Sequence, residues 1–498
     1  MDLNPENEAR SKEETLAVAG NIRAEQCNIN RTAGSTRAPS ERDHANFGWK
    51  IGVFFAGLLS LPIVAGWLSA PVQAVPSYSR QTGMPCSMCH TSPLELTPFG
   101  REFKLNGYTL ATNERITDAG DKKEHSGLNL AKSLPLSAMM QISVTNTGSP
   151  QPGTQNGNVE FPQQASLFLA GAWTSHIGSF TQVTYTAQGD HFSWDNTDIR
   201  YANQHKLGGK PFVYGITLNN NPTVEDLWND TPAWGFPYVS SDSAPTPASA
   251  TLIDGTLAQD VAGVGGYAMW NNHLYMAGTM YRSEHLGAPQ PNSGEGEAFN
   301  IQGLAPYWRV AWQQNLSKNN YLEFGSYGIH AQSTPNVVTG PTDSYTDTAL
   351  DFQYERTIPQ WKNNILTVHG TLIHENSALN ATFAAGGAAF PHHQLNTARA
   401  DAAYHFGNKY SATFGWFNTT GSTDPLLLAP ASVTGSIDGD PHSSGYIANF
   451  SWWPIQNVDI GLQYTGYTRF NGASINYDGS GRNAASNNAF YGVLWFMF

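Results

Sequence analysis

From residue 134 onward the chain alternates apolar and polar positions with a period of two. In 134–145 the even positions are apolar and the odd ones mostly polar, and the pattern returns at 181–186, 350–355, 366–372 and 398–404. Strands of this kind place one face against an apolar environment and the other in a wet one. Acidic, basic and histidine side chains fall on the second face, which predicts a polar interior.

The segments between the predicted strands alternate between short turns and long loops rich in Gly, Pro, Ser and Asn. This alternation is typical of bacterial outer-membrane barrels, which have short periplasmic turns and long external loops. The sequence therefore predicts a mainly β fold, with a transmembrane barrel of about sixteen strands over 134–498. Short turns are expected at 177–178, 208–209, 271–272, 317–318, 407–408 and 455–456, and long loops near 148–162, 220–256, 284–302, 331–344, 376–392, 420–439 and 470–486.

The chain ends on the aromatic stretch 490–498, in which every second residue except Gly492 is large and apolar. We expect a final lipid-facing strand here. A terminal Phe in such a strand resembles the signature that the bacterial outer-membrane assembly machinery reads. The alternative, an aromatic edge strand of a soluble sheet, would be an aggregation hazard.

Composition agrees with a barrel in lipid. Charged residues make up 13% of the chain, aromatic residues 12%, and there are 48 glycines. This is too uncharged for an ordinary cytosolic surface and too polar for a helical membrane bundle. The net charge of −13 excludes the basic surface of a nucleic-acid-binding protein.

The N-terminal part predicts export. Residues 1–49 are hydrophilic and without periodicity, either because the start is assigned too early or because they form a tail that is discarded with the signal. A signal peptide follows over 50–74, with an apolar run, small residues at its end and cleavage after Ala74. The run is also long enough for a retained anchor, but a barrel must leave the inner membrane to reach the outer one. We therefore expect an outer-membrane location.

The most specific chemical motif is Cys86-Ser87-Met88-Cys89-His90. A C-x-x-C-H run predicts covalent attachment of a c-type haem, because two thiols on one helical turn can add to its two vinyl groups while the histidine binds the iron. A zinc half-site would need a second cysteine pair, and a thioredoxin-like dithiol does not need the histidine. We expect one haem c, held by Cys86 and Cys89, with His90 as proximal ligand.

The surrounding segment, 75–133, is too short to build a substantial core alone, and a covalently held haem would act as its staple. Phe99, Phe103 and Leu105 are candidates to cover the haem. Arg101 and Lys104 are candidates to meet its propionates, although solvated basic side chains over a small core are an equal alternative.

The sixth iron ligand is open at the level of sequence. Met84 and Met88 flank the attachment site on the proximal side. Met139 falls on the lumen side of the first predicted strand and is the best-placed distal ligand if the haem segment plugs the barrel. The alternatives are His125, in a charged loop, and Met140.

With motif, segment and barrel together, the chain resembles the fused cytochrome-porins of iron-oxidising bacteria. The residues that carry the resemblance are 80–83, 96–101 and the stretch from 191–196 through Trp228. The resemblance implies an oxidoreductase-like electron-transfer protein that oxidises extracellular Fe(II) and passes the electron inward through one haem. Its partners would then be the external donor, outer-membrane lipid and a periplasmic carrier such as a soluble cytochrome.

A different class of function stays open beside this one. The barrel alone would also suit a porin for a small solute, in which the haem segment is a plug, a gate or a redox sensor, because a fold does not determine a function.

Overall fold

In the computed structural model, the described residues are 75–92, 94–110, 115–117, 129–131, 133–286, 299–335, 338–361 and 364–498. The predictions for 1–49, for the signal peptide 50–74 and for His125 lie outside these residues. Among the described residues, no helix is long and apolar enough to cross a membrane.

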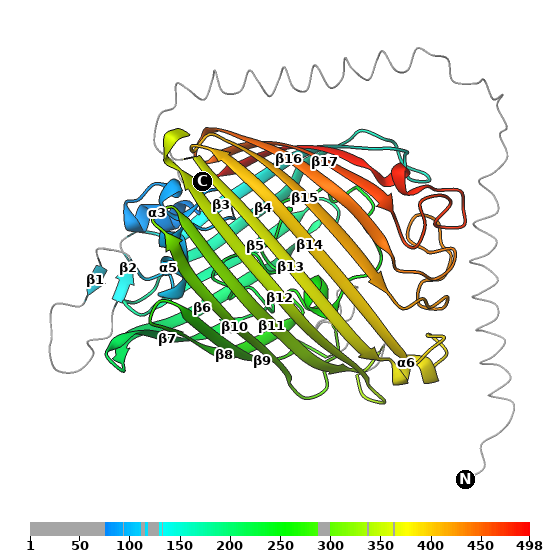
Figure 1. The fold of residues 1–498 in the computed structure, drawn as a ribbon, viewed down its shortest axis with the longest axis horizontal. Helices are drawn as coiled ribbons and strands as arrows, with labels where there is room; N and C mark the ends of the chain where they lie inside the picture. Colours follow the sequence, from blue (N-terminus) through cyan, green and yellow to red (C-terminus); the bar gives the residue numbers. More distant parts are fainter. Residues whose placement is uncertain are drawn as a thin grey trace, which may run out of the picture. The chain divides into compact units, whose positions relative to one another are not determined.

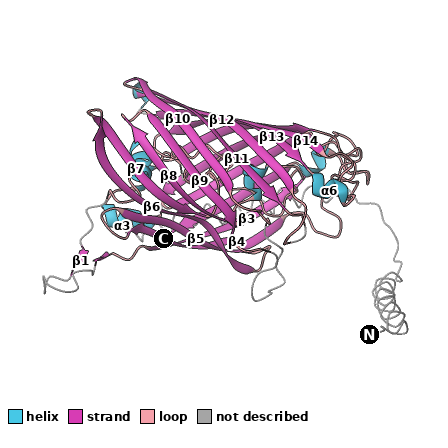
Figure 2. Ribbon diagram, turned by 90° about the horizontal axis from the view of Figure 1, so that it is seen from below, coloured by secondary structure: helices cyan, strands magenta, loops and turns pink. Residues whose placement is uncertain are grey.

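A closed antiparallel barrel dominates the described chain (Figures 1 and 2). Its sixteen strands each pair with the next along the chain, and β18 pairs with β3 to close the ring. The predicted strand number and the predicted final strand are therefore confirmed. The strands are β3 (Leu136–Thr147), β4 (Asn158–Ala172), β5 (Ile177–Thr186), β6 (His191–Leu207), β7 (Lys210–Asn219), β8 (Val261–Trp270), β9 (Leu274–Ser283), β10 (Ala305–Ser317), β11 (Asn320–Ser333), β12 (Asp343–Ile358), β13 (Asn364–Ala378), β14 (His392–Phe406), β15 (Tyr410–Gly421), β16 (Ser443–Ile455), β17 (Val458–Arg469) and β18 (Ala489–Met497).

Short helices and one small sheet accompany the barrel. Helices α3 (Pro76–Thr82), α4 (Cys86–Cys89) and α5 (Pro98–Leu105) precede it, and β1 (Arg115–Thr117) pairs with β2 (Asn129–Ala131). Helix α6 (Asn380–Ala384) lies in the loop between β13 and β14. Figure 1 places α3 and α5 at the barrel end where the C-terminus is marked, and α6 at the opposite end.

The two faces of the barrel wall follow the predicted alternation. On β12 the inward positions Asp351 and Gln353 are buried, whereas Leu350 on the outer face is 57% exposed. Leu372 and Phe414 are similarly exposed on their strands. An apolar outer face with every strand edge paired is what a bilayer requires of a β-structure. The barrel is therefore of the outer-membrane type.

The turn positions agree with the prediction to within a few residues. The turns at 208–209, 271–272 and 407–408 lie where expected. The predicted turns at 317–318 and 455–456 lie one residue later, because Ser317 belongs to β10 and Ile455 to β16, and Ile177 and Gly178 already belong to β5. Their turn is 173–176, because the backbone N–H groups of Trp173 and Thr174 donate to the Ile177 carbonyl oxygen.

The long connection between β7 and β8 corrects one expectation. The sequence predicts an external loop at 220–256, but residues 220–260 fold into the barrel, and we call them the inward loop. Its backbone N–H groups at Leu252 and Ile253 donate to Glu375 and Asp347 on the inner wall, at 2.7 Å each. Polar inner-wall side chains thus satisfy a loop that would otherwise be solvated.

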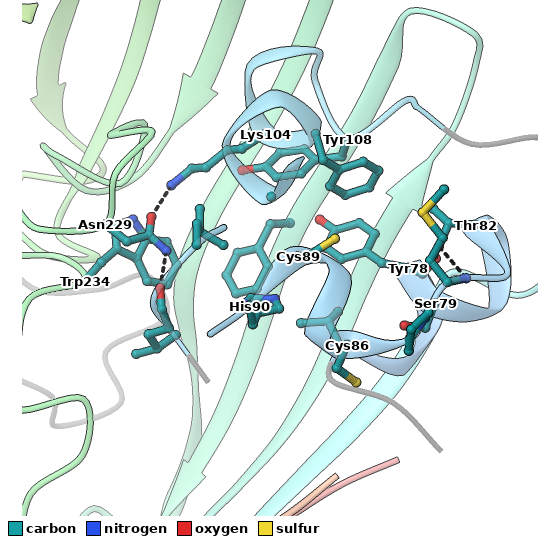
Figure 3. A pocket seen from close by; sticks show the side chains of 18 residues that line it. Tyr78, Ser79, Thr82, Cys86, Cys89, His90, Lys104, Tyr108, Asn229 and Trp234 are labelled. Atoms are coloured by element: carbon teal, nitrogen blue, oxygen red, sulfur yellow. Dashed lines mark hydrogen bonds between the residues drawn. The ribbon is translucent and has the colours of Figure 1, made fainter. Parts of the chain in front are cut away.

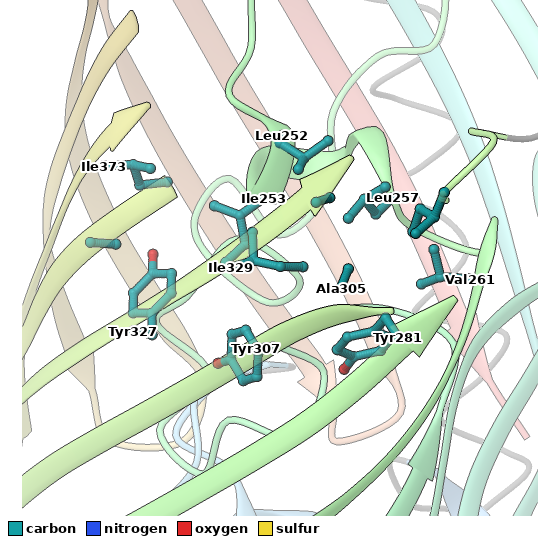
Figure 4. Packing of buried hydrophobic residues seen from close by; sticks show 13 residues of the cluster. Leu252, Ile253, Leu257, Val261, Tyr281, Ala305, Tyr307, Tyr327, Ile329 and Ile373 are labelled. Carbon is teal, nitrogen blue, oxygen red and sulfur yellow. The ribbon is translucent and has the colours of Figure 1, made fainter. Parts of the chain in front are cut away.

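Apolar side chains hold one part of the inward loop against the wall (Figure 4). Leu252, Ile253 and Leu257 pack on buried side chains of β9 to β13, among them Tyr281 and Tyr327. The lumen is consequently packed at this level by the chain's own residues.

Candidate haem-attachment site

The motif cysteines lie on the single turn of α4, and His90 follows directly. The His90 backbone N–H donates to the Cys86 carbonyl oxygen at 2.9 Å, which continues the turn into the histidine. The two thiols are not joined in a disulfide. One helical turn with two thiols and an adjacent imidazole is the arrangement that covalent haem attachment requires.

Helix α5 clamps this turn from one side. The Thr97 hydroxyl donates to the Met88 carbonyl oxygen at 2.6 Å, and the Thr97 backbone N–H donates to that of Cys89 at 2.9 Å. The same hydroxyl caps α5 by accepting from the Gly100 N–H at 3.1 Å. A β-carbon at Gly100 would lie 2.2 Å from the Cys89 carbonyl oxygen, so only glycine fits. The 96–101 stretch is therefore a support for the motif.

Helix α3 fastens the segment to the barrel wall. Arg80 donates to the Leu136 carbonyl oxygen, and Gln81 accepts from the Ala172 N–H at 3.0 Å. Gly83 ends the helix in the left-handed region, with φ of 69°. Residues 80–83, the stretch before the motif that also carries the family resemblance, thus attach the haem-motif segment to the barrel. These contacts place the segment at the short-turn end of the barrel.

A cavity with about 770 Å³ of empty space adjoins the motif (Figure 3). Cys86, Cys89 and His90 line it, together with residues of α3, α5, β5 and the inward loop. Most of the lining is apolar or aromatic: it includes Tyr78, Met84, Leu96, Phe103, Phe180 and Trp234. A smaller cavity of about 420 Å³ touches Cys86 and His90 from another side, beside Trp453 and Met497.

These residues fit a haem. The larger cavity has the mostly apolar and aromatic wall that is usual for sites of organic ligands and cofactors. The Nδ1 atom of His90 is buried and has no hydrogen-bond partner among the described residues. Burial lowers the pKa of His90 to about 4, which keeps the imidazole in the neutral form that binds metals. Cys86, Cys89 and His90 would hold the group.

The two basic residues that are candidates to meet the haem propionates, Arg101 and Lys104, lie in different environments. Arg101 pairs with Glu355 on β12 and lies over the Tyr321 ring at 4.3 Å, so it does not line the cavity. Lys104 lines the cavity, and its Nζ donates to Asn229 Oδ1 at 2.9 Å. Burial, together with the nearby Arg200, lowers the pKa of Lys104 to about 7. Lys104 is therefore the one of the two that is placed to meet an anionic group there.

Of the three apolar residues that are candidates to cover the haem, only one lines the cavity. Phe103 is 5% exposed, lines the cavity and packs edge-on against Tyr78, with ring centroids 5.0 Å apart. Leu105 instead joins a buried cluster with Leu227 and Trp228 of the inward loop. Phe99 does not line the cavity.

The methionine candidates for the sixth ligand lie in three different places. Met139 faces the lumen as predicted, but it is buried in a cluster with Phe168 and Trp495 and does not line the larger cavity. Met140 lies on the outward face of β3. Met84 lines the cavity. Met139 as the distal ligand stays a prediction.

The inward loop contributes site residues that sequence reasoning missed. Asn229 and Trp234 complete the cavity wall, and Asn229 also donates to the Leu94 carbonyl oxygen at 2.9 Å. A signal was present in the sequence. Two acids and two tryptophans within 226–234 are unusual for a solvated loop and are typical of a buried, functional one.

These features define the class of the chain: an outer-membrane β-barrel with a haem-motif segment packed into the mouth at its short-turn end. The sequence matches no protein-family model and no curated protein.

Solved outer-membrane proteins match 73% of this chain. They include an anion-selective porin from Comamonas acidovorans (9% identity, 98% of that chain, TM-score 0.43). Two others are the outer membrane channel DcaP of Acinetobacter baumannii (9%, 96%, 0.41) and the trimer form of OmpT from Vibrio cholerae (10%, 98%, 0.40).

Proposed function

We propose that this chain is an outer-membrane electron-transfer protein that carries one haem c. In this proposal it takes single electrons from extracellular Fe(II) and delivers them to a periplasmic carrier such as a soluble cytochrome. The observation that carries the proposal is the position of Cys86, Cys89 and His90 on the wall of a mostly apolar cavity in the barrel mouth. Bound haem supplies one-electron redox chemistry.

The chain's own residues would set the environment of that chemistry. Cys86 and Cys89 provide thioether attachment, and His90 provides a neutral nitrogen ligand. Phe103, Trp234 and the other aromatic side chains of the wall exclude water. Lys104, whose pKa lies near 7, offers a positive charge beside the mostly apolar wall when its amine is protonated. Each of these features tunes a redox potential.

Fe(II) as the donor is supported by the resemblance to cytochrome-porins and by a physical argument. Ferric iron precipitates near neutral pH, so a cell that uses Fe(II) as a donor gains by importing the electron and leaving the metal outside. Electron tunnelling falls steeply with distance, so a redox centre lodged inside a barrel shortens the gap across the membrane. The inward loop, which packs the lumen, favours passage of electrons over passage of solutes.

A porin for a small solute is the second candidate, and one observation favours it. A cavity of about 470 Å³ with both polar and apolar lining lies between α5 and the inner wall, where Arg101, Gln204 and Gln313 line it. A solute could enter this cavity, with the haem-motif segment acting as plug, gate or redox sensor.

Replacing Cys86 and Cys89 by Ala in the full chain separates the two functions, with Ser87→Ala as the matched control on the same turn. Cells carrying the double variant should lose covalent haem and Fe(II)-dependent electron uptake, and the control should keep both. If electron uptake survives without haem while solute flux changes, the electron-transfer function is wrong and the porin function is favoured.

A further inference from the structure

A buried cluster of acids lies in the lumen beside the haem-motif segment. Arg309 on β10 is at its centre and binds Asp351 of β12 through two hydrogen bonds, of 2.9 and 2.7 Å. The same guanidinium lies 3.1 Å from Asp226, 3.5 Å from Glu323 and 3.7 Å from Asp230. All five side chains are fully buried.

The charges in this cluster do not balance. Four carboxylates surround Arg309. Two further cations among the described residues face them: Lys104 of α5, which is held at Asn229 next to Asp230, and Arg101, whose charge is already paired with Glu355. If all the groups are ionised, two negative charges remain in a region that excludes water. Uncompensated buried charge is strongly unfavourable, so either protons or a cation must neutralise it.

Oxygen atoms in the cluster also lack N–H donors. Both carboxylate oxygens of Asp230 and Oε2 of Glu323 are buried and have no N–H donor among the described residues. Within hydrogen-bonding reach they have only other carboxyl groups, those of Asp226 and Asp351. One oxygen each from Asp230, Glu323 and Asp351 lie within 4.8 Å of one another. The buried Tyr327 hydroxyl likewise has no partner, and the Tyr327 ring lies against Arg309 at 5.5 Å. Unsatisfied buried oxygens are rare in folded proteins and call for a ligand.

We propose that Asp230, Glu323 and Asp351 form a binding site for one divalent metal cation inside the barrel. Three carboxylates present hard oxygen ligands of the kind that Mg²⁺, Mn²⁺ and Fe²⁺ accept. One divalent ion supplies the two positive charges that the cluster lacks. The structure thus assigns a cation to the lumen that is distinct from the haem-attachment site.

The position of this site gives it a role in the reaction. Asp230 directly follows Asn229, which lines the cavity at Cys89 and His90. Toward the long-loop end, Asp347 precedes Asp351 by four residues on the same face of β12, about 13 Å away at the usual rise of a strand. Asp347 Oδ1 is again buried without a hydrogen-bond partner among the described residues. We infer that the site holds Fe(II) as electron donor, a role that rests on the proposed function, whereas the binding itself does not.

The test is binding of Mn²⁺ to the purified, haem-loaded full chain in detergent, followed by the loss of the free Mn²⁺ electron paramagnetic resonance signal. The wild type should bind one Mn²⁺. The double variant D230N/E323Q should bind it at least about tenfold more weakly, as loss of groups at a metal site generally does. Asn and Gln keep the side-chain size, and the variant leaves the two hydrogen bonds between Arg309 and Asp351 in place, so the barrel should fold.

The matched control is Asp459→Asn on β17, another buried inner-wall acid with an unpartnered oxygen, and it should bind Mn²⁺ like the wild type. No Mn²⁺ binding by the folded wild type, or equal binding by D230N/E323Q, would overturn the site and leave shared protons as the neutralising charge.

Reduction of the haem by Fe(II) tests separately whether this site holds the electron donor. If D230N/E323Q loses Mn²⁺ but is reduced as fast as the wild type, the site is not the donor site and the proposed function stands. If the wild-type haem is not reduced, the proposed function fails while the metal site stands.

Discussion

At the scale of single residues, the haem motif depends on neighbours that carry no chemistry themselves. Gly100 permits α5 to touch the Cys89 carbonyl group, and Thr97 caps α5 while holding the Met88 carbonyl group. Glu95 anchors the turn between α4 and α5 to the barrel, with its Oε2 2.7 Å from His405 Nε2. Small changes at these positions should therefore act on the haem site.

The first prediction concerns Gly100→Ala. Its β-carbon would overlap the Cys89 carbonyl oxygen, so α4 and α5 must move apart, at a cost of about 1–3 kcal/mol for an overpacked contact. We expect less covalently bound haem per folded barrel, measured from the absorbance of the denatured haem. Glu102→Ala, at an exposed position of the same helix, is the control. Unchanged haem content in Gly100→Ala would contradict the clamp.

The second prediction concerns pH. Burial by itself raises the pKa of the Glu95 carboxyl, but the contact with His405 outweighs it and holds the pKa at about 2, below the ordinary 4.5. A lowered folded-state pKa stabilises the fold above pH 4.5, and this contribution is lost as the pH falls through 2. Glu95→Gln should therefore reduce the free energy of unfolding by roughly 3 kcal/mol at pH 7.

Urea unfolding from pH 7 down to pH 2 measures this contribution. The difference between wild type and Glu95→Gln should shrink steadily over that range, and Glu102→Gln should show no such change. A difference that stays constant down to pH 2 would show that the Glu95 charge does not contribute.

At the scale of elements, the inward loop connects the haem site to the barrel. Asp226 accepts from the backbone N–H groups of Trp228, Asp230 and Thr231 and so fixes the compact turn at its centre. Beyond that turn, Ser241 contacts Thr145 on the opposite wall at 2.6 Å. The loop crosses the lumen and should limit conduction.

The third prediction is that deletion of 222–256, rejoined by a short Gly-Ser link, raises ion conductance in planar bilayers severalfold above that of the wild type. The loop is the main part of the described chain that packs the lumen away from the short-turn end. Deletion of 152–155, an exposed stretch between β3 and β4, is the control and should leave conductance unchanged. Equal conductance in both deletions would mean that the loop does not block the lumen.

The strands could be predicted from the sequence because their signal is local. A period of two over five or six residues already says which side chains face lipid, and Asp351 and Glu355 indeed face inward. The sequence signal of the haem motif is equally local. The course of the inward loop has no local signal, because it depends on contacts between separate elements, such as that of Asp226 with Arg309. Packing between distant residues also decides that Arg101 pairs with Glu355 while Lys104 lines the cavity, which the sequence alone does not show.

At the scale of the whole barrel, the parts form a line along the lumen. The long-loop end carries acids on the inner wall, the inward loop and its buried acidic cluster follow, and the haem-motif segment occupies the short-turn end. The segment and the barrel belong to one compact unit, so the candidate haem site is built jointly by both. The proposed electron transfer would use this arrangement, with the haem-motif segment at the short-turn mouth of a largely packed barrel.

The most direct test of this account is the absorption spectrum of the purified, oxidised full chain during anaerobic addition of Fe(II). The account predicts c-type haem bands that change to the reduced form, with one Fe(II) oxidised for each haem reduced. Haem bands that stay oxidised in excess Fe(II), or a folded barrel without covalent haem, would contradict it.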